Sequence, residues 1–217
     1  MAESDLSNPG CRVCGHPETR LFPAGKVIYW RCLHCMATFM DAVHLPDPAA
    51  ERKRYEQHEN SPDDPGYRHF LAKIAEPLGK RLSPGSRGLD FGCGPSPVLA
   101  AMMAESGHAM VVYDPFFFPD KRALESDYDF IVCTEVVEHF HAPAAEFGLL
   151  DRLLRPGGYL GIMTCFQNDD AKFENWHYRR DMTHVAFYRE RTFHVIALRF
   201  GWHCDIPAKD LVLMQKP

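Results

Sequence analysis

The sequence predicts an α/β fold: a doubly wound, mostly parallel sheet preceded by a small cysteine-rich module. Three observations support this. Residues 89–95, LDFGCGP, describe a strand that runs into a glycine-rich turn. Further short apolar runs then alternate with helical segments, which favours parallel strands. Near the N-terminus, two C-x-x-C pairs lie close enough together to share one metal ion.

The two C-x-x-C pairs make the first predicted element. Their four thiolates can bind one tetrahedral Zn²⁺, and residues 26–32, KVIYWRC, suit a strand that leads into the second pair. This pattern resembles a zinc ribbon, so we expect residues 1–45 to form one around a structural zinc. Two disulfides or a redox C-x-x-C are the alternatives, which a reducing compartment and the absence of a βαβ context disfavour. The expected ligands are Cys11, Cys14, Cys32 and Cys35.

Residues 46–84 are expected to form a helical linker or lid. Residues 51–59 are a charged helical stretch, and residues 60–66, NSPDDPG, have the composition of a loop. Residues 67–82 return to a helical period with one broad apolar face.

Residues 85–217 are expected to form the core domain. Apolar runs predict its strands and amphipathic periods predict its helices. The last two strands are expected to pair antiparallel. In chain order we expect a strand ending at residue 91, a helix over 96–107, strands over 109–113 and from 128, and a helix over 144–154. Residues 153–164 are expected to hold that helix end, a Pro-Gly-Gly turn and a further strand, followed by a helix over 191–200 and strands over 202–206 and 210–215.

The glycine-rich turn has the features of a nucleotide-binding corner. Gly92 and Gly94 let the backbone turn sharply and approach a ligand closely. The third glycine of the dinucleotide fingerprint is missing, because Pro97 occupies its place. Asp90 would repel a phosphate but attract an ammonium or sulfonium group. Asp114 follows about twenty residues later at a strand end, where a carboxylate can bind ribose hydroxyls.

The order of four motifs resembles that of the class I S-adenosylmethionine-dependent methyltransferases, which have a Rossmann-like sheet. The motifs are LDFGCG, AMVVYD, YDFIVCTEVVEHF and LLRPGGYLGIMT, and the resemblance covers residues 85–217. It implies methyl transfer from S-adenosylmethionine. It also implies donor contacts from Asp90, Gly92, Cys93, Gly94, Asp114, Pro115, Thr134, Glu135, Tyr67 and His58.

One region departs from the family pattern. Only residues 116–127 separate the second strand from the next, which is too short for the family's helix and third strand. We therefore expect the third strand to be missing or vestigial. Phe116, Phe117 and Phe118 could cover the adenine of the donor, or they could close the edge of a shortened sheet.

In this family the acceptor pocket is built outside the nucleotide corner, and two segments here suit that role. Residues 55–70 and the long loop of residues 166–188 mix aromatics, histidines and charges. Within the loop, RDMTHVAFY resembles a stretch found in bacterial small-molecule methyltransferases. We predict His184 as a general base, the alternative being that it only ties the loop to the core. The candidate catalytic residues are His184, Asp181, His177 and Tyr188.

Glu138, His139 and His141 could suggest a metal site, but neighbours on one turn do not easily converge on one ion. The resemblance implies instead that this turn packs near the donor. The acceptor's identity is not given by the sequence.

Charge helps to choose between acceptor classes. The net charge is −5, and the ribbon segment holds few Lys or Arg, whereas an RNA reader needs a basic stripe. We therefore favour a small-molecule acceptor. An RNA or protein methyltransferase that uses the ribbon for recognition is the alternative, and a donor-binding regulator is the third possibility. No apolar run is long enough to span a membrane, and the polar N-terminus does not look like a signal peptide, so we expect a cytoplasmic protein.

Overall fold

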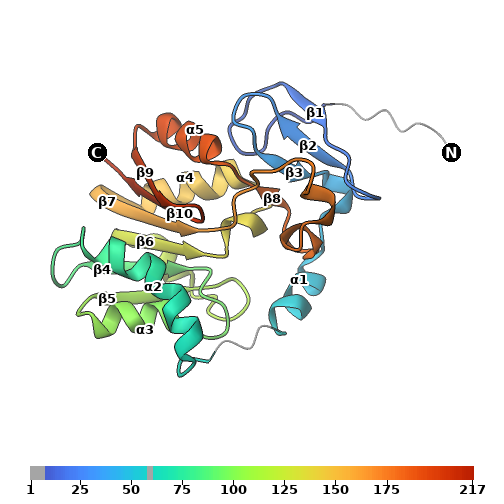
Figure 1. The fold of residues 1–217 in the computed structure, drawn as a ribbon. Helices are drawn as coiled ribbons and strands as arrows, with labels where there is room; N and C mark the ends of the chain where they lie inside the picture. The colour runs from blue at the N-terminus through green and yellow to red at the C-terminus, as the bar shows by residue number, and fades with distance from the viewer. Residues whose placement is uncertain (1–7, 58–60) are drawn as a thin grey trace.

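The computed structural model describes residues 8–57 and 61–217, which form two sheets, and Figure 1 shows the smaller one beside one end of the larger. The larger has the strand order β5-β4-β6-β7-β10-β9 and the smaller the order β1-β2-β3-β8. The strands of the larger sheet are β4 (Arg87–Phe91), β5 (Ala109–Tyr113), β6 (Tyr128–Thr134), β7 (Leu154–Met163), β9 (His203–Ala208) and β10 (Leu211–Gln215). The strands of the smaller sheet are β1 (Thr19–Leu21), β2 (Tyr29–Cys32), β3 (Thr38–Met40) and β8 (Ala186–Phe187).

The larger sheet confirms the predicted α/β core. Strand β4 pairs in parallel with β5 and β6, and β6 pairs in parallel with β7. Strand β10 pairs antiparallel with both β7 and β9, as expected for the closing pair. Because β4 to β7 are parallel, their carboxyl ends meet at one edge, which is where such sheets bind ligands.

Helices cover both faces of this sheet. On one face α2 and α3 bury Leu71, Ile74 and Leu99 against Phe130 and Leu213. On the other face α4 and α5 bury their apolar sides against the same strands. Asp64 is the N-cap of helix α2, and its side chain accepts a hydrogen bond from the Gly66 amide. The helices are α1 (Pro48–Tyr55), α2 (Pro65–Gly79), α3 (Val98–Glu105), α4 (Pro143–Leu153) and α5 (Glu190–Phe200).

The shortened region lies where the sequence predicted it. Between β5 and β6 the chain forms only the short 3₁₀ helix η2 (Lys121–Glu125). Strand β5 is therefore the edge of the sheet, and no third strand lies beyond it among the described residues. Phe116, Phe117 and Phe118 are half-buried beside this edge.

The smaller sheet is completed by the C-terminal half of the chain. Thr38 and Phe39 of β3 pair with Phe187 and Ala186 of β8. The main apolar cluster continues across this junction, because it joins residues of the ribbon to the helices and strands of the core. Residues 8–45 thus form a sheet that shares its interior with the core domain. No described helix combines the length and apolar character that a membrane crossing requires.

Candidate active site

The glycine turn after β4 has the geometry that its sequence predicted. Gly92 and Gly94 have φ values of 76° and 64°, in the left-handed region that favours glycine. A Cβ at Gly92 would lie 2.7 Å from the side chain of Val136, whereas nothing lies within 4 Å of a Cβ at Gly94. The backbone at Gly92 is therefore packed against Val136, whereas the space beside Gly94 is open.

Asp114 at the end of β5 ties this turn to the next one. Its Oδ2 accepts a hydrogen bond from the Gly94 amide at 3.0 Å. Its Oδ1 accepts bonds from the amides of Phe116 and Phe117 at 2.8 and 3.1 Å. We call residues 89–95 together with Asp114 the donor corner. Asp114 therefore links the glycine turn after β4 to the turn after β5.

Asp90 is the buried acidic group of the donor corner. Its side chain is only 4% exposed. Burial, and then the charge of Asp114, raise its pKa to about 7, against a backbone hydrogen bond from Ala100. A carboxylate in this position would be stabilised by a cationic ligand.

Other groups at the carboxyl end of β6 face the same region. Thr134 Oγ1 is buried with no hydrogen-bond partner among the described residues. Glu135 has a φ of 54°, which is unusual for a residue with a side chain. Tyr67 of α2 lies close by, since burial and then the charges of Asp90 and Glu135 raise its pKa to about 12. An orphaned hydroxyl and a buried carboxylate at one sheet edge fit a polar, positively charged ligand.

The remaining predicted donor contacts differ in position. Cys93 is half-buried within the turn, and Pro115 is exposed beside Asp114. His58 lies outside the described residues, so the structure does not place it.

The long loop after β7 brings His184 against His139. The two imidazole rings are 4.7 Å apart, and the ring of Tyr178 lies 4.2 Å from that of His184. His184 Nδ1 lies 2.7 Å from the Tyr178 carbonyl, and His139 Nδ1 lies 2.9 Å from the Thr183 carbonyl. Because a carbonyl only accepts, each Nδ1 carries a proton, so in the neutral form of each ring the lone pair is on Nε2.

Glu138 lies beneath this histidine pair and is fully buried. Its two oxygens accept hydrogen bonds from the hydroxyls of Tyr178 and of Thr164, the latter at 3.0 Å. Burial, and then the charge of Glu135, raise the pKa of Glu138 well above its ordinary value. The sequence did not single out Tyr178 or Thr164, because neither lies in a recognisable motif.

Three of the four predicted catalytic residues line one hollow of about 430 Å³, namely His177, Asp181 and His184. Asp181 accepts hydrogen bonds from Arg54 at 2.8 Å and from the Thr183 amide at 3.0 Å. Burial acts to raise the pKa of Asp181, but the bonds from Thr183 and Arg54 outweigh it and lower the pKa to about 2.

Tyr188, the fourth candidate, does not reach the hollow. It is fully buried, and its hydroxyl donates to the Val137 carbonyl at 2.8 Å. In this arrangement Tyr188 packs the core beneath the loop.

Helix α1 spans from the donor corner to this loop. The ring of Tyr55 lies 5.5 Å from that of Phe116 and 5.1 Å from that of His139. Glu51 pairs with His141 at 2.9 Å, so His141 is engaged by α1 and does not join Glu138 and His139. The histidine pair is thus connected through Tyr55 to Phe116, whose amide donates to Asp114 of the donor corner.

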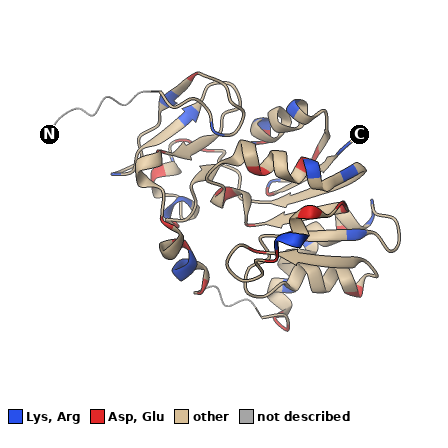
Figure 2. Ribbon diagram, turned by 180° about the vertical axis from the view of Figure 1, so that it is seen from behind, with Lys and Arg blue, Asp and Glu red and all other residues tan. Residues whose placement is uncertain are grey.

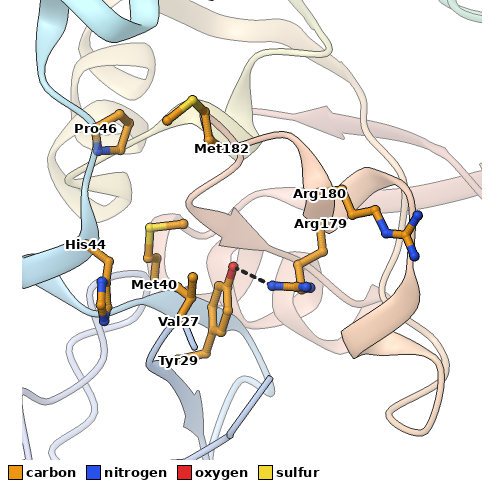
Figure 3. Close-up of a pocket in the computed structure, with 8 residues that line it drawn as sticks. All are labelled: Val27, Tyr29, Met40, His44, Pro46, Arg179, Arg180 and Met182. Atoms are coloured by element: carbon orange, nitrogen blue, oxygen red, sulfur yellow. Dashed lines mark hydrogen bonds between the residues drawn. The ribbon is translucent and has the colours of Figure 1, made fainter. Parts of the chain in front are cut away.

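A second hollow, of about 340 Å³, lies between the ribbon and the same loop (Figure 3). Arg180 and Met182 line both hollows. On the ribbon side the wall is formed by Val27, Tyr29, Met40 and His44. The Arg179 guanidinium extends toward the Tyr29 hydroxyl, 3.5 Å away.

The four ribbon cysteines converge as zinc ligands would. Cys11 and Cys35 have their sulfurs 3.6 Å apart, and Cys14 and Cys32 have theirs 3.7 Å apart. Four sulfurs at about 2.3 Å from a tetrahedral Zn²⁺ are separated by about 3.8 Å. The amides of His34 and Cys35 both donate to the Cys32 sulfur at 3.4 Å. Both the spacing and the amide donors fit a structural zinc.

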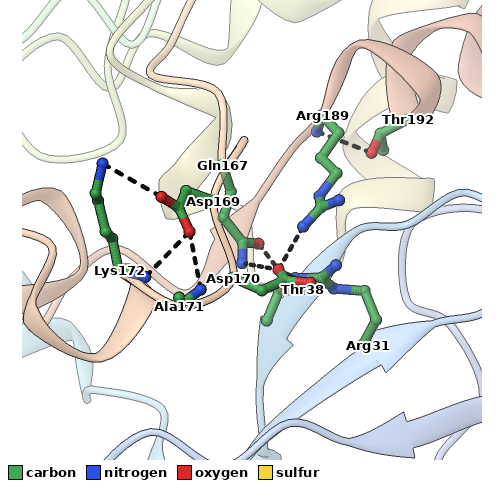
Figure 4. Close-up of polar contacts among 9 residues, drawn as sticks. All are labelled: Arg31, Thr38, Gln167, Asp169, Asp170, Ala171, Lys172, Arg189 and Thr192. Atoms are coloured by element: carbon green, nitrogen blue, oxygen red, sulfur yellow. Dashed lines mark hydrogen bonds and ion pairs between the residues drawn. The ribbon is translucent and has the colours of Figure 1, made fainter.

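A polar network fixes the ribbon to the loop of residues 166–188, which we call the acceptor loop after its predicted role (Figure 4). Buried Arg31 of β2 forms an ion pair with Asp170 at 2.7 Å and donates to the Thr38 hydroxyl at 2.6 Å. That hydroxyl in turn donates to Gln167 at 2.6 Å, and Arg189 also pairs with Asp170. The sequence analysis did not identify this network. The sequence feature that could have indicated it is Arg31, a charged residue inside the otherwise apolar strand β2.

Comparison with known proteins agrees with this geometry. A family model described as a methyltransferase domain matches residues 65–205. The chain resembles 1,6-didemethyltoxoflavin-N1-methyltransferase of Burkholderia thailandensis, at 17% identity and a TM-score of 0.55, over 91% of this chain and 97% of that one. It also resembles an S-adenosylmethionine-dependent methyltransferase of Methanosarcina mazei, at 16% identity and a TM-score of 0.50, over 64% and 96% of the two chains.

Among curated protein sequences, no relative matches the chain. The solved structures, at these identities, show a shared fold, and the family model covers well over half of the sequence. The chain therefore belongs to the methyltransferase-domain family and is a class I S-adenosylmethionine-dependent methyltransferase.

Proposed function

We propose that this enzyme transfers a methyl group from S-adenosylmethionine to a small-molecule acceptor bound against the loop of residues 166–188. The observation that carries this proposal is the position of His177, Asp181 and His184 around one hollow. The ring of Tyr55 contacts both His139 and Phe116, and the Phe116 amide donates to Asp114 of the donor corner, which supports a donor and an acceptor that bind near each other.

The donor corner fits S-adenosylmethionine in its chemistry. When bound, the donor supplies a methyl group on a positively charged sulfur that is already a good leaving group. We propose that Asp114 binds the ribose hydroxyls, supported by its position at the end of β5, and that a charged donor would satisfy the buried Asp90 carboxyl and the buried Thr134 hydroxyl. The chain's main contribution is then to position two reactants, which can supply much of the rate acceleration.

The hollows favour a small acceptor. Their volumes of about 340 and 430 Å³ lie in the range of small-molecule sites. Basic and acidic residues are interspersed over the described elements, as Figure 2 shows from behind, which does not favour a nucleic-acid surface. The Burkholderia relative also acts on a small molecule, as its name states.

His184 is the central residue of the proposed acceptor site. Its Nδ1 is fixed on the Tyr178 carbonyl, so its Nε2 carries the lone pair. Two roles are open to that nitrogen. It can take a proton from the acceptor, or it can bind a cation that makes the acceptor more acidic.

We further propose that Cys11, Cys14, Cys32 and Cys35 hold one structural zinc. Four thiolate ligands close the coordination sphere, so the ion takes no part in the reaction. Four cysteines kept as thiolates require a reducing compartment, which supports a cytoplasmic location.

The acceptor class can be tested with labelled donor. The purified protein is incubated with S-adenosylmethionine that carries a labelled methyl group and with cell extract, before and after treatment with nuclease or protease. We expect the label in a low-mass fraction that survives both treatments. Label that disappears after nuclease or protease would establish the RNA or protein alternative. Tight donor binding without any transfer would indicate a donor-binding regulator.

A further inference from the structure

We propose that Glu138, His139 and His184 bind a divalent transition-metal ion that activates the acceptor. This inference rests on the proposed methyl transfer and specifies the chemistry of its acceptor site. One potential ligand atom from each of these residues lies within 4.8 Å of the other two. Glu138 and His139 come from the turn after β6, and His184 comes from the loop after β7. The third ligand is therefore supplied by tertiary structure, which no local motif shows.

The surroundings orient these three residues as metal ligands are usually oriented. Both imidazoles direct Nδ1 to a backbone carbonyl, at 2.9 Å for His139 and 2.7 Å for His184. Metal-binding histidines typically make this contact, which fixes the tautomer and the orientation of the ring. Glu138 accepts hydrogen bonds from Tyr178 and Thr164, as ligating carboxylates do. A carboxylate has about four lone-pair positions, so two hydroxyl donors leave room for an ion.

The charge balance of this region also favours a cation. Glu138 is fully buried, and no ion pair joins it to a Lys, Arg or His in the described part of the chain. A second carboxylate, Glu135, lies near enough to raise the pKa of Glu138 further. A fully buried carboxyl group without an ion-pair partner, next to a second, half-buried carboxyl group, is costly. A divalent ion would offset this cost directly.

The donor set indicates the kind of ion and its role. Two imidazoles and one carboxylate suit a first-row transition metal better than magnesium, which prefers oxygen ligands. Three protein ligands leave coordination positions for an acceptor oxygen or nitrogen. An acceptor hydroxyl held there would lose its proton to solvent more easily. The resulting oxygen would attack the methyl carbon of the donor as the bond from that carbon to sulfur breaks, and the neutral thioether would leave. His184 then acts as a ligand and not as the base.

The test uses Co²⁺ as the probe, because its visible absorption differs between thiolate and imidazole–carboxylate ligands. The full-length protein is treated with a chelator, and Co²⁺ binding is followed by absorption and calorimetry. We expect one equivalent to bind outside the thiolate site. His184→Gln and His139→Gln should weaken this binding by at least about 10- to 100-fold, the loss typical of even outer partners of a metal site. His177→Gln is the matched control, because His177 lies on the same loop but outside the cluster.

The wild-type protein alone can overturn the proposal, whatever the variants do. If it binds no Co²⁺ beyond the thiolate site, or if its metal-free form methylates the acceptor at the full rate, the ion has no role. Variants that bind Co²⁺ as tightly as the wild type, with unchanged donor affinity as proof of folding, would also overturn it. If Co²⁺ binds but no extract fraction takes up label, the proposed methyl transfer fails and the metal site stands.

Discussion

The donor corner and the acceptor loop are built in opposite ways. The donor corner is assembled from strand ends and tight turns, and its hydrogen bonds to the end of β5 join residues 20 or 21 positions apart, as between Gly94 and Asp114. The acceptor loop is held by contacts across the whole chain. Its bonds to the ribbon join residues 139 and 129 positions apart, as in the Arg31–Asp170 and Thr38–Gln167 pairs. The donor corner is therefore formed mainly by nearby segments of the chain, whereas the acceptor loop is held by the ribbon, which is more than 100 residues away in the sequence.

This difference gives the ribbon a function beyond its own stability. Strand β8 of the acceptor loop extends the ribbon sheet, and Thr192 of α5 donates to the Cys35 carbonyl at 2.9 Å. Disturbing the ribbon should therefore affect the acceptor loop more than the donor corner. The predictions below test this asymmetry.

The largest effect is expected from Cys32→Ser, which removes one proposed zinc ligand. Cys32 is fully buried in the main apolar cluster, so its loss also disturbs the core. We expect unfolding to become easier by about 3 kcal/mol or more, which lowers Tm by about 6–12 °C for a chain of this size. In the fraction that stays folded, donor affinity should persist while acceptor methylation is lost. Calorimetry with donor and scanning calorimetry measure the two quantities.

Cys204→Ser is the control for this experiment. Cys204 is half-buried on the edge strand β9 of the larger sheet and is not one of the four ribbon cysteines. Its replacement should change stability by less than about 1 kcal/mol. Equal Tm values for the two variants, or no zinc in protein purified without chelator, would contradict the proposed zinc site.

The next effect tests the donor corner alone. Asp114→Ala removes the carboxylate that is placed to bind the donor ribose and that holds three backbone amides. Donor affinity should fall by about 1–3 kcal/mol, because charge-assisted hydrogen bonds are lost. The ribbon should keep its zinc. A folded variant that binds the donor as tightly as the wild type does would remove Asp114 from the site.

The comparison also explains how much of the fold the sequence could predict. The strands around residues 89–91, 109–113 and 128–134 were predictable because buried parallel strands are continuous apolar runs. The missing third strand was predictable because residues 116–127 cannot hold a helix and a strand. The junction of β3 with β8 was not predictable, because Ala186–Phe187 is a two-residue strand with no pattern of its own.

The candidate site divides in the same way. Asp90, Gly92 and Gly94 could be found from their spacing, since the turn's conformation demands glycine. The Glu138–His139–His184 cluster could not, because its two parts are separated by a strand, a helix and a long loop. Tyr188 was chosen from the motif RDMTHVAFY, and the structure buries its side chain in the core just after β8, with its hydroxyl on the Val137 carbonyl.

A smaller effect should come from the link between ribbon and loop. Asp170→Asn weakens the ion pairs with Arg31 and Arg189, but Asp170 is 42% exposed, so we expect only about 1–2 kcal/mol in stability. Acceptor KM should rise while donor affinity does not change. Asp169→Asn is the matched control. Asp169 is next to Asp170 in the chain, but among the described residues its carboxylate forms an ion pair only with the exposed Lys172. Similar acceptor KM values for the two variants would argue against a role for this link.

The smallest effect concerns pH and isolates Asp90. Burial raises the pKa of Asp90 to about 7, so without donor its carboxyl keeps a proton at mildly acidic pH. The ionised form is the one that attracts a cationic donor. Affinity should therefore fall as pH decreases through 7, by about tenfold or 1.4 kcal/mol between pH 8 and pH 6. Donor binding near pH 7 should also release a proton, which calorimetry in buffers of different ionisation enthalpy detects.

Asp90→Asn has no such proton, so it should bind more weakly at pH 8 and retain only the pH dependence of the donor itself. A wild-type profile that matches that of Asp90→Asn would show that Asp90 does not titrate against the donor, and the acidic group that recognises the sulfonium would then have to be sought at Glu135.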